Sequence, residues 1–214
     1  MAAPIFAAAI LGAALAPAGV AAGSTVAALW HMNETSGTTM VDSSGHGNNG
    51  TLHSVQTAYG CSARGYTFNG TSSYVSVPSS ASLNPGSANI TISFYLSTTS
   101  LPKSGDYDLL RKGAYPAQNY KVELLPGGQI MCTFQGSSSR HNATGGSGLN
   151  NGAWHHIQCI KTASQIKTVI DGTVRATTNA TVGSISNTSA AYLGAHPGSD
   201  WYKGKLDEAS ITIG

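Results

Sequence analysis

The feature that most constrains this chain is a series of short segments in which apolar and polar residues alternate, separated by turn-forming pairs such as Pro-Gly, Asn-Gly and Asp-Gly. Alternation with a period of two is typical of β-strands with one buried face, because successive side chains point to opposite sides. The segments recur at intervals of about ten residues, the spacing of an antiparallel sandwich or jelly roll. The clearest segments are residues 90–95, 120–124, 130–134, 166–170 and 209–213. No helical period or composition break follows residue 22, so the sequence predicts one all-β domain over residues 23–214.

The composition limits the class of partner. Only 9% of the residues are charged, and 11 Lys and Arg against 9 Asp and Glu leave a net charge of +2. The basic residues are scattered, so the chain lacks the clusters that bind nucleic acid through its phosphates. Hydrophobic residues make up 41% of the chain, which is enough for a sizeable core and argues against disorder. No apolar run is long enough to cross a bilayer of ~30 Å, so we expect no membrane span.

The first residues have the pattern of an export signal. Residues 5–16 are apolar and rich in alanine, and Pro17 and small residues up to Gly23 follow them. An apolar core followed by small residues is typical of a signal peptide, although no basic residue precedes this one. A short buried helix is the alternative, but the run has no polar face and no cap. We therefore expect residues 1–22 to be a signal peptide and the protein to be secreted as a monomer.

The cysteines agree with export. Cys132 and Cys159 each lie in a segment with strand-like alternation. If those strands are neighbours, the two sulfur atoms can form a disulfide, which an oxidising compartment permits. Cys61 is then left over as a free or intermolecular thiol. A zinc site is disfavoured, because the spacings include no Cys-x-x-Cys pair.

Several longer motifs occur in a fixed order along the chain. They are residues 29–39, 42–52, 66–70, 74–78, 152–157, 169–172, 192–194 and 202–208. In order and spacing these motifs resemble a laminin G-like domain of the concanavalin A-like lectin/glucanase family, from about Ala28 to the last residue. The resemblance implies an all-β, two-sheet antiparallel jelly-roll sandwich with its terminal strands side by side.

Catalytic carboxylates are not evident in the sequence. A retaining glycosidase needs two carboxyl groups ~5 Å apart, which on one strand means acidic residues at i and i+2 or i+4. The Glu-x-Asp-x-x-Glu arrangement of glucanases that share this fold is absent. Asp106 and Asp108 have a suitable spacing, but we interpret them as part of a solvated loop. Glu123 stands alone between Val122 and Leu124, so the sequence predicts a protein without catalytic activity.

A calcium site is better supported. The Gly-rich turn at residues 42–50 offers oxygen atoms from Asp42, Asn48 and its backbone, and Ca²⁺ prefers oxygen ligands. Asp207 lies two residues before Ala209, and residues two apart on a regular strand point to the same side. We therefore expect Asp207 to point inward, where a buried carboxylate needs a partner. The resemblance implies a structural calcium near the termini and carries over to Asp42 and Asp207. The alternative is that Asp42 caps the turn by hydrogen bonds and Asp207 pairs with backbone amides.

Four aromatic side chains are candidates for binding a glycan. Tyr115, His196, Trp201 and Tyr202 lie in or beside loops rich in Gly, Pro and Asp. A sugar ring can stack on such side chains while nearby polar groups bind its hydroxyls. The alternative for Trp201 and Tyr202 is that they close the core beneath the last strand. An acidic glycan would instead need a gathering of the basic residues, of which the candidates are Arg111, Lys112, Arg140, Lys203 and Lys205.

Together these observations favour a secreted, non-catalytic module, stabilised by calcium, that binds extracellular polysaccharide or a glycosylated surface. A second hypothesis is a polysaccharide-degrading hydrolase or lyase with a divergent site, which requires groups such as Glu123 and Asp106 to converge. A third is an adhesion or spacer domain with a protein partner, which predicts an exposed apolar patch and no aromatic groove.

Overall fold

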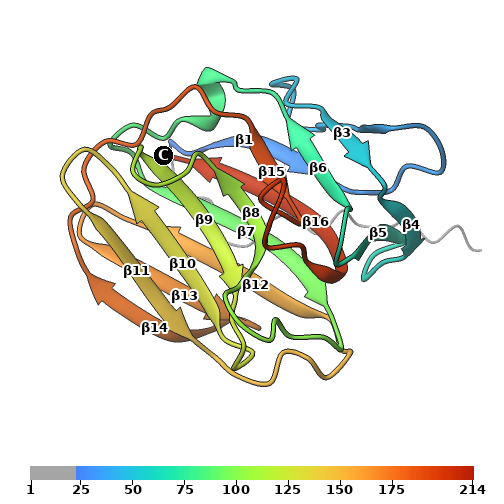
Figure 1. Ribbon diagram of the computed structural model, residues 1–214. Coiled ribbons are helices and arrows are strands. Elements are labelled where there is room, and N and C mark those ends of the chain that lie inside the picture. The colour runs from blue at the N-terminus through green and yellow to red at the C-terminus, as the bar shows by residue number, and fades with distance from the viewer. Residues whose placement is uncertain (1–22) are drawn as a thin grey trace, which may run out of the picture.

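The computed structural model describes residues 23–214, so the expected signal peptide lies outside the described residues. Two antiparallel sheets pack face to face, as predicted for a jelly-roll sandwich (Figure 1). Sheet A has the order β14-β13-β12-β7-β16-β5-β4, with β1 also paired to β16, and sheet B has the order β11-β10-β9-β8-β15-β6-β3-β2. Among residues 23–214, no helix is long and apolar enough to cross a membrane.

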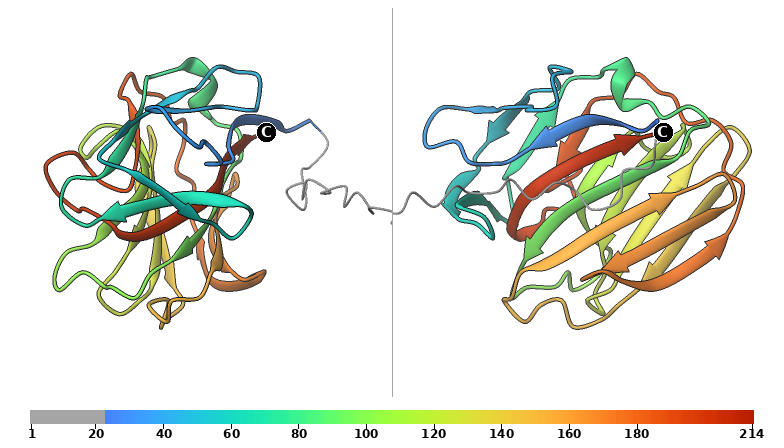
Figure 2. Two further views of the ribbon diagram at one scale, coloured as in Figure 1. Left: turned by 90° about the vertical axis from the view of Figure 1, so that its right-hand side faces the viewer. Right: turned by 180° about the vertical axis from the view of Figure 1, so that it is seen from behind.

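The strands of sheet A are β1 (Thr25–Trp30), β4 (Gln56–Tyr59), β5 (Arg64–Asn69), β7 (Ile90–Ser97), β12 (His155–Lys161), β13 (Gln165–Ile170), β14 (Thr173–Asn179) and β16 (Lys203–Ile213). Those of sheet B are β2 (Thr39–Met40), β3 (Gly50–His53), β6 (Tyr74–Val77), β8 (Tyr107–Lys112), β9 (Asn119–Leu124), β10 (Ile130–Gln135), β11 (Arg140–Gly145) and β15 (Ala191–Leu193). A single 3₁₀ turn, η1 (Ala81–Leu83), interrupts the described strands. The first and last strands, β1 and β16, lie side by side, as the resemblance implied (Figure 2).

The core lies between the sheets and follows the alternation in the sequence. In β9, for example, Tyr120, Val122 and Leu124 are fully buried, and they point toward the opposite sheet. The predicted hairpin between β13 and β14 turns at Asp171 and Gly172, whose φ angles are 51° and 73°. A two-residue turn with positive φ at both positions matches the twist of the strands that it joins.

A disulfide joins the two sheets. Cys132 in β10 of sheet B and Cys159 in β12 of sheet A are bonded, with their Cα atoms 5.5 Å apart. The two strands are not hydrogen-bonded neighbours; they face each other across the core. The bond therefore fastens the sandwich through its interior. Cys61 is a free, exposed thiol.

A β-bulge in β16 changes the direction of Asp207. Asp207 is opposite Tyr95 of β7, whereas Ser210 is opposite Ser93, so β16 has one extra residue between the two pairs. Opposite residues share a face of the sheet, and Tyr95 lies on the outer face because Phe94 beside it is in the core. The expectation that Asp207 is buried is confirmed, since it is 0% exposed. The expectation that it shares the inward direction of Ala209 is wrong, because the bulge reverses the alternation between them.

Candidate functional site

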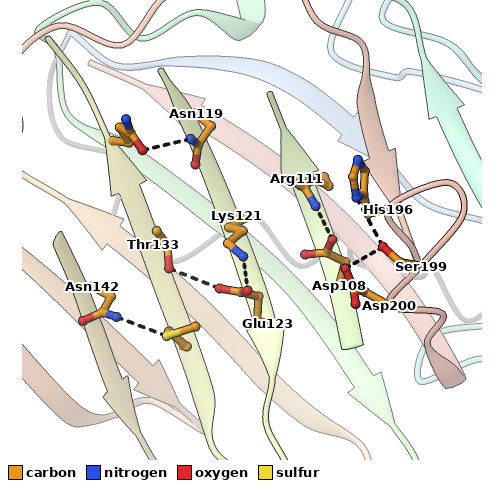
Figure 3. Close-up of polar contacts among 12 residues, drawn as sticks. Asp108, Arg111, Asn119, Lys121, Glu123, Thr133, Asn142, His196, Ser199 and Asp200 are labelled. Carbon is orange, nitrogen blue, oxygen red and sulfur yellow. Dashed lines mark hydrogen bonds and ion pairs between the residues drawn. The ribbon is translucent and has the colours of Figure 1, made fainter. Parts of the chain in front are cut away.

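Charged side chains gather on the outer face of sheet B, where an ordinary sandwich shows solvated polar residues (Figure 3). Because alternate residues of β9 fill the core, Lys121 and Glu123 point outward. Arg111 of β8 is opposite Lys121 and shares this face. With Asp106 and Asp108 these residues form what we call the charged cluster.

A second bulge brings Asp108 into the charged cluster. Asp108 is opposite Glu123, while Leu110 is opposite Val122, so Leu109 is an extra residue in β8. Asp108 therefore faces outward with Glu123. In a regular strand it would share the inward face of Leu110, which lies two residues later. The interpretation of Asp108 as part of a solvated loop is wrong: it lies within β8 and only 1% of it is exposed.

The charged cluster is internally paired. The Arg111 Nη1 donates to Asp108 Oδ2 at 2.5 Å. The Lys121 ammonium contacts Glu123 Oε1, and Thr133 Oγ1 donates to Glu123 Oε2 at 3.2 Å. Burial raises the pKa of Asp108 to about 6, although Arg111 opposes the shift. Burial likewise raises the pKa of Glu123 to about 7 against the effect of Lys121.

Three acidic residues converge here, which the sequence did not reveal. One carboxylate oxygen each of Asp106, Asp108 and Glu123 lies within 4.8 Å of the other two. Glu123 is thus not isolated, and it is fully buried. The spacing of Asp106 and Asp108 was a usable signal, but the contribution of Glu123 depends on how β8 and β9 pair.

Next to the charged cluster, four aromatic side chains lie together on the same face of sheet B. His53 of β3 stacks on Tyr74 of β6 with 4.2 Å between ring centroids and 8° between ring planes. The rings of Tyr192 in β15 and Trp201 lie 6.2 and 5.9 Å from that of Tyr74. All four are partly exposed, and we call them the aromatic cluster. Tyr192 is opposite Arg111, so the two clusters adjoin.

The predicted ligand-binding residues divide between this face and other places. Trp201 belongs to the aromatic cluster, and His196 lies beside Asp108 in Figure 3, with its Nδ1 3.3 Å from Ser199 Oγ. Burial lowers the pKa of His196. Tyr115 is 71% exposed in the loop after β8, where the Arg140 guanidinium lies 5.7 Å from its ring centroid.

The assignment of Tyr202 to ligand binding has to be corrected. Its side chain is fully buried, and its hydroxyl donates to the carbonyl oxygens of Ser97 and Lys205 at 3.1 and 3.2 Å. Its ring lies 5.9 Å from that of Phe68 in the core. A glycan in solvent has no access to such a ring, so Tyr202 closes the core, which was the alternative for this residue.

The carboxylates proposed for calcium are held by hydrogen-bond donors of the protein. Asp42 accepts four hydrogen bonds, from the backbone N–H groups of Leu29, Ser44 and Asn48 and from the Ser44 hydroxyl. The side-chain amide of Asn48 donates to the Ala27 carbonyl oxygen at 2.7 Å. This is the turn-capping arrangement that was the alternative to a metal.

Asp207 is held in a similar way at a separate place. It accepts hydrogen bonds from the backbone N–H groups of Cys61, Ser62 and Glu208 and from the Cys61 thiol. Asp42 and Asp207 share none of these donors. The calcium site at Asp42, Asn48 and Asp207 therefore stays a prediction, with both carboxylates already engaged.

The basic residues do not gather into one patch. Lys112 is fully buried, and its ammonium bonds to the backbone and side chain of Asn187 at 2.9 Å. Arg111 and Arg140 belong to different strands of sheet B, whereas Lys203 and Lys205 belong to β16 in sheet A. Among the described residues, the five basic candidates for an acidic glycan therefore do not form one cluster.

Comparisons with known proteins give a family and a fold. A family model described as the concanavalin A-like lectin/glucanases superfamily matches residues 69–212. No curated protein matches the chain. Domain 4 of AbnA, a GH43 extracellular arabinanase from Geobacillus stearothermophilus solved with arabinotriose, is 18% identical with a TM-score of 0.69, over 89% of this chain and 93% of that one.

Two toxin domains are also similar. The binding domain of Paraclostridial Mosquitocidal Protein 1 is 17% identical (TM-score 0.71), over 87% of this chain and 48% of that one. The binding domain of botulinum neurotoxin DC, solved with SialylT, is 12% identical (TM-score 0.69), over 87% and 47%. The chain thus spans about half the length of each toxin domain. At these identities the likeness shows the fold alone, whereas the family model covers most of the chain, and the protein therefore belongs to the concanavalin A-like lectin/glucanases superfamily.

Proposed function

We propose that this protein is a secreted, monomeric glycan-binding module that uses the outer face of sheet B and does not cleave its ligand. The observation that carries the proposal is that the partly exposed aromatic cluster adjoins the charged cluster along one sheet face, where Tyr192 is opposite Arg111 and where Asp106 and Lys121 are the accessible polar side chains. Most sugar-binding sites need both kinds of group, because a sugar ring has an apolar face and a rim of hydroxyls.

The aromatic cluster supplies the apolar contact. Its rings come from three strands and one loop and hold one another at centroid distances of 4.2 to 6.2 Å. Side chains packed in this way lose little conformational freedom when a ligand binds, which lowers the cost of binding. His196 and Asp200 lie beside β8 and offer hydrogen-bonding groups there (Figure 3), and Asp200 directly precedes Trp201 of the aromatic cluster.

The charges indicate which glycans fit. The charged cluster holds three carboxyl groups against two basic side chains, Arg111 and Lys121. An anionic chain would find little accessible positive charge here, because Arg111 is buried and paired with Asp108, and Lys121 is paired with Glu123. We therefore expect a neutral polysaccharide. Two similar folds were solved with an oligosaccharide or a sialyl ligand, which supports glycan binding as a use of this architecture.

The test is a binding assay on residues 23–214. Neutral polysaccharides are screened by affinity electrophoresis, and the best ligand is titrated by calorimetry against Tyr192→Ala and Trp201→Ala. We expect each substitution to weaken binding about tenfold, since stacked aromatic contacts are worth about 0.5–1.5 kcal/mol beyond their buried area. Tyr59→Ala is the matched control, because Tyr59 is 89% exposed on β4 of sheet A. Unchanged affinity in both test variants would refute the proposal.

A hydrolase is the second candidate, because the carboxyl groups of Asp106, Asp108 and Glu123 do converge. Two of the three are unsuited to touch a polymer, since Asp108 is 1% exposed and Glu123 is fully buried. The distinguishing measurement is the release of new reducing ends from the bound polysaccharide. Release that disappears in Glu123→Gln, while binding is kept, would replace the binding module with an enzyme.

A further inference from the structure

The charged cluster leaves two carboxylate oxygens without partners. Oδ1 of Asp106 and Oδ1 of Asp108 are buried and accept no hydrogen bond. A buried acceptor without a partner costs about 1–3 kcal/mol, and more when it is charged. Such atoms are rare in folded proteins and call for an explanation, such as a proton, a water molecule or an ion.

The spacing of the acidic oxygens fits a single ion. Oxygen ligands lie 2.3–2.6 Å from Ca²⁺, so two ligands of one ion are at most about 5 Å apart. One oxygen each of Asp106, Asp108 and Glu123 satisfies this limit, since all three lie within 4.8 Å of one another. Three carboxylates this close repel one another, and the ion pairs with Arg111 and Lys121 offset only part of this repulsion, because Asp106 has no such partner among the ion pairs of the described residues.

Asp108 is the strongest indication of a ligand. It is 1% exposed, its Oδ2 is held by Arg111, and its Oδ1 has no partner. In Figure 3 the oxygen that Arg111 does not hold points toward β9, where Glu123 lies. The free oxygen is therefore directed at the other acidic side chain of the group.

We propose that Asp106, Asp108 and Glu123 bind a divalent cation of the calcium type. The three side chains offer only oxygen, and hard cations prefer oxygen to the nitrogen and sulfur ligands that zinc selects. The burial of Asp108 and Glu123 excludes a polymer but not an ion, which is far smaller. The partly exposed Asp106 makes the site accessible from solvent. This site is separate from the turn at Asp42, and it does not depend on the glycan-binding proposal.

Lys121 competes with the cation. Its ammonium already contacts Glu123, and its side chain is 16% exposed. A flexible four-carbon stem lets the ammonium turn toward solvent when an ion with two charges arrives. Removing this positive charge with Lys121→Met should therefore strengthen binding of the ion, whereas a merely structural ion pair would give no such gain.

The experiment titrates CaCl₂ by calorimetry into residues 23–214 after EDTA has been removed. Asp106→Asn, at the partly exposed position, should weaken Ca²⁺ binding by at least about tenfold. Lys121→Met should tighten it about tenfold. Asp200→Asn is the matched control, because Asp200 is an acidic residue beside the cluster whose carboxylate accepts from Ser199.

Three results would overturn the site. The first is no Ca²⁺ binding by the wild type or by Lys121→Met, which would mean that the unpartnered oxygens share a proton. The second is equal affinity in the wild type and Asp106→Asn. The third is loss of binding in Asp42→Asn with Asp106→Asn unaffected, which would place the ion at the Gly-rich turn. Glycan binding measured in EDTA reports on the other proposal by itself.

Discussion

Replacing Asp42 with alanine should destabilise the protein by about 3–4 kcal/mol, because several donors lose one acceptor together. The Asp42 carboxylate accepts four hydrogen bonds at 2.8–2.9 Å and is 9% exposed. The N–H of Asn48 lies in a buried residue, and leaving it unpaired costs about 2 kcal/mol. The N–H groups of Leu29 and Ser44 are nearer to water and add about 0.5–1 kcal/mol each. The Ser44 hydroxyl can turn to solvent at little cost.

An isosteric variant, Asp42→Asn, separates the contributions of the two carboxylate oxygens. In Asp42→Asn the amide oxygen can keep the bonds from Leu29 and Ser44, whereas the amide NH₂ would face the N–H of Asn48. We therefore expect a loss of about 2 kcal/mol, between the wild type and Asp42→Ala. At this chain length 1 kcal/mol corresponds to about 2–4 °C in Tm, so alanine should lower Tm by about 6–16 °C.

The assay is unfolding by urea and by heat, once in EDTA and once in excess Ca²⁺. A loss below about 1 kcal/mol for Asp42→Ala in EDTA would refute the hydrogen-bond reasoning. A Tm that rises with Ca²⁺ in the wild type but not in Asp42→Asn would instead support the calcium site predicted from the Gly-rich turn.

Two further predictions concern stability. The loop between Cys132 and Cys159 has a sequence separation of 27, so chain entropy predicts that reduction costs about 3.5 kcal/mol; an unchanged urea midpoint in dithiothreitol would contradict this. His156 stacks on Tyr95 at 4.6 Å between ring centroids, and burial lowers its pKa below 6.5 although Asp171 opposes the shift. The folded state thus favours neutral His156, so its contribution is complete above pH 6.5 and is lost as the pH falls through the lowered pKa. Unfolding free energies measured across this range should depend less on pH in His156→Gln, and equal slopes would refute the assignment.

Much of the fold could be predicted because its core follows local alternation. Residues such as Tyr120, Val122 and Leu124 are spaced so that only a strand places all three on one face. The turn at Asp171 and Gly172 was equally predictable from the sequence, because few residue pairs adopt positive φ at both positions. These signals lie within a few residues of one another and do not require knowledge of which strands pair.

The site was harder to predict because it is assembled between strands. The aromatic cluster draws His53, Tyr74 and Tyr192 from β3, β6 and β15, which are neighbours in sheet B but distant in sequence. No local pattern marks these residues as companions. Asp207 was misplaced for a different reason, since a bulge adds a residue that simple alternation cannot anticipate.

The bulge at Leu109 shifts the inward–outward alternation of β8 by one residue, so the segments before and after it follow different patterns. Before it, Asp108 occupies an outward position; after it, Leu110 occupies an inward one, although two residues apart should share a face. A regular strand with the same sequence would point the Asp108 carboxylate into the core or Leu110 toward the outer face. Whether a related chain has the carboxylate pair therefore depends on a single inserted residue. In an alignment with a relative that lacks the bulge, Leu109 requires a one-residue gap. An alignment without that gap would still match the apolar positions of β8, but it would align Asp108 with the wrong residue of the relative.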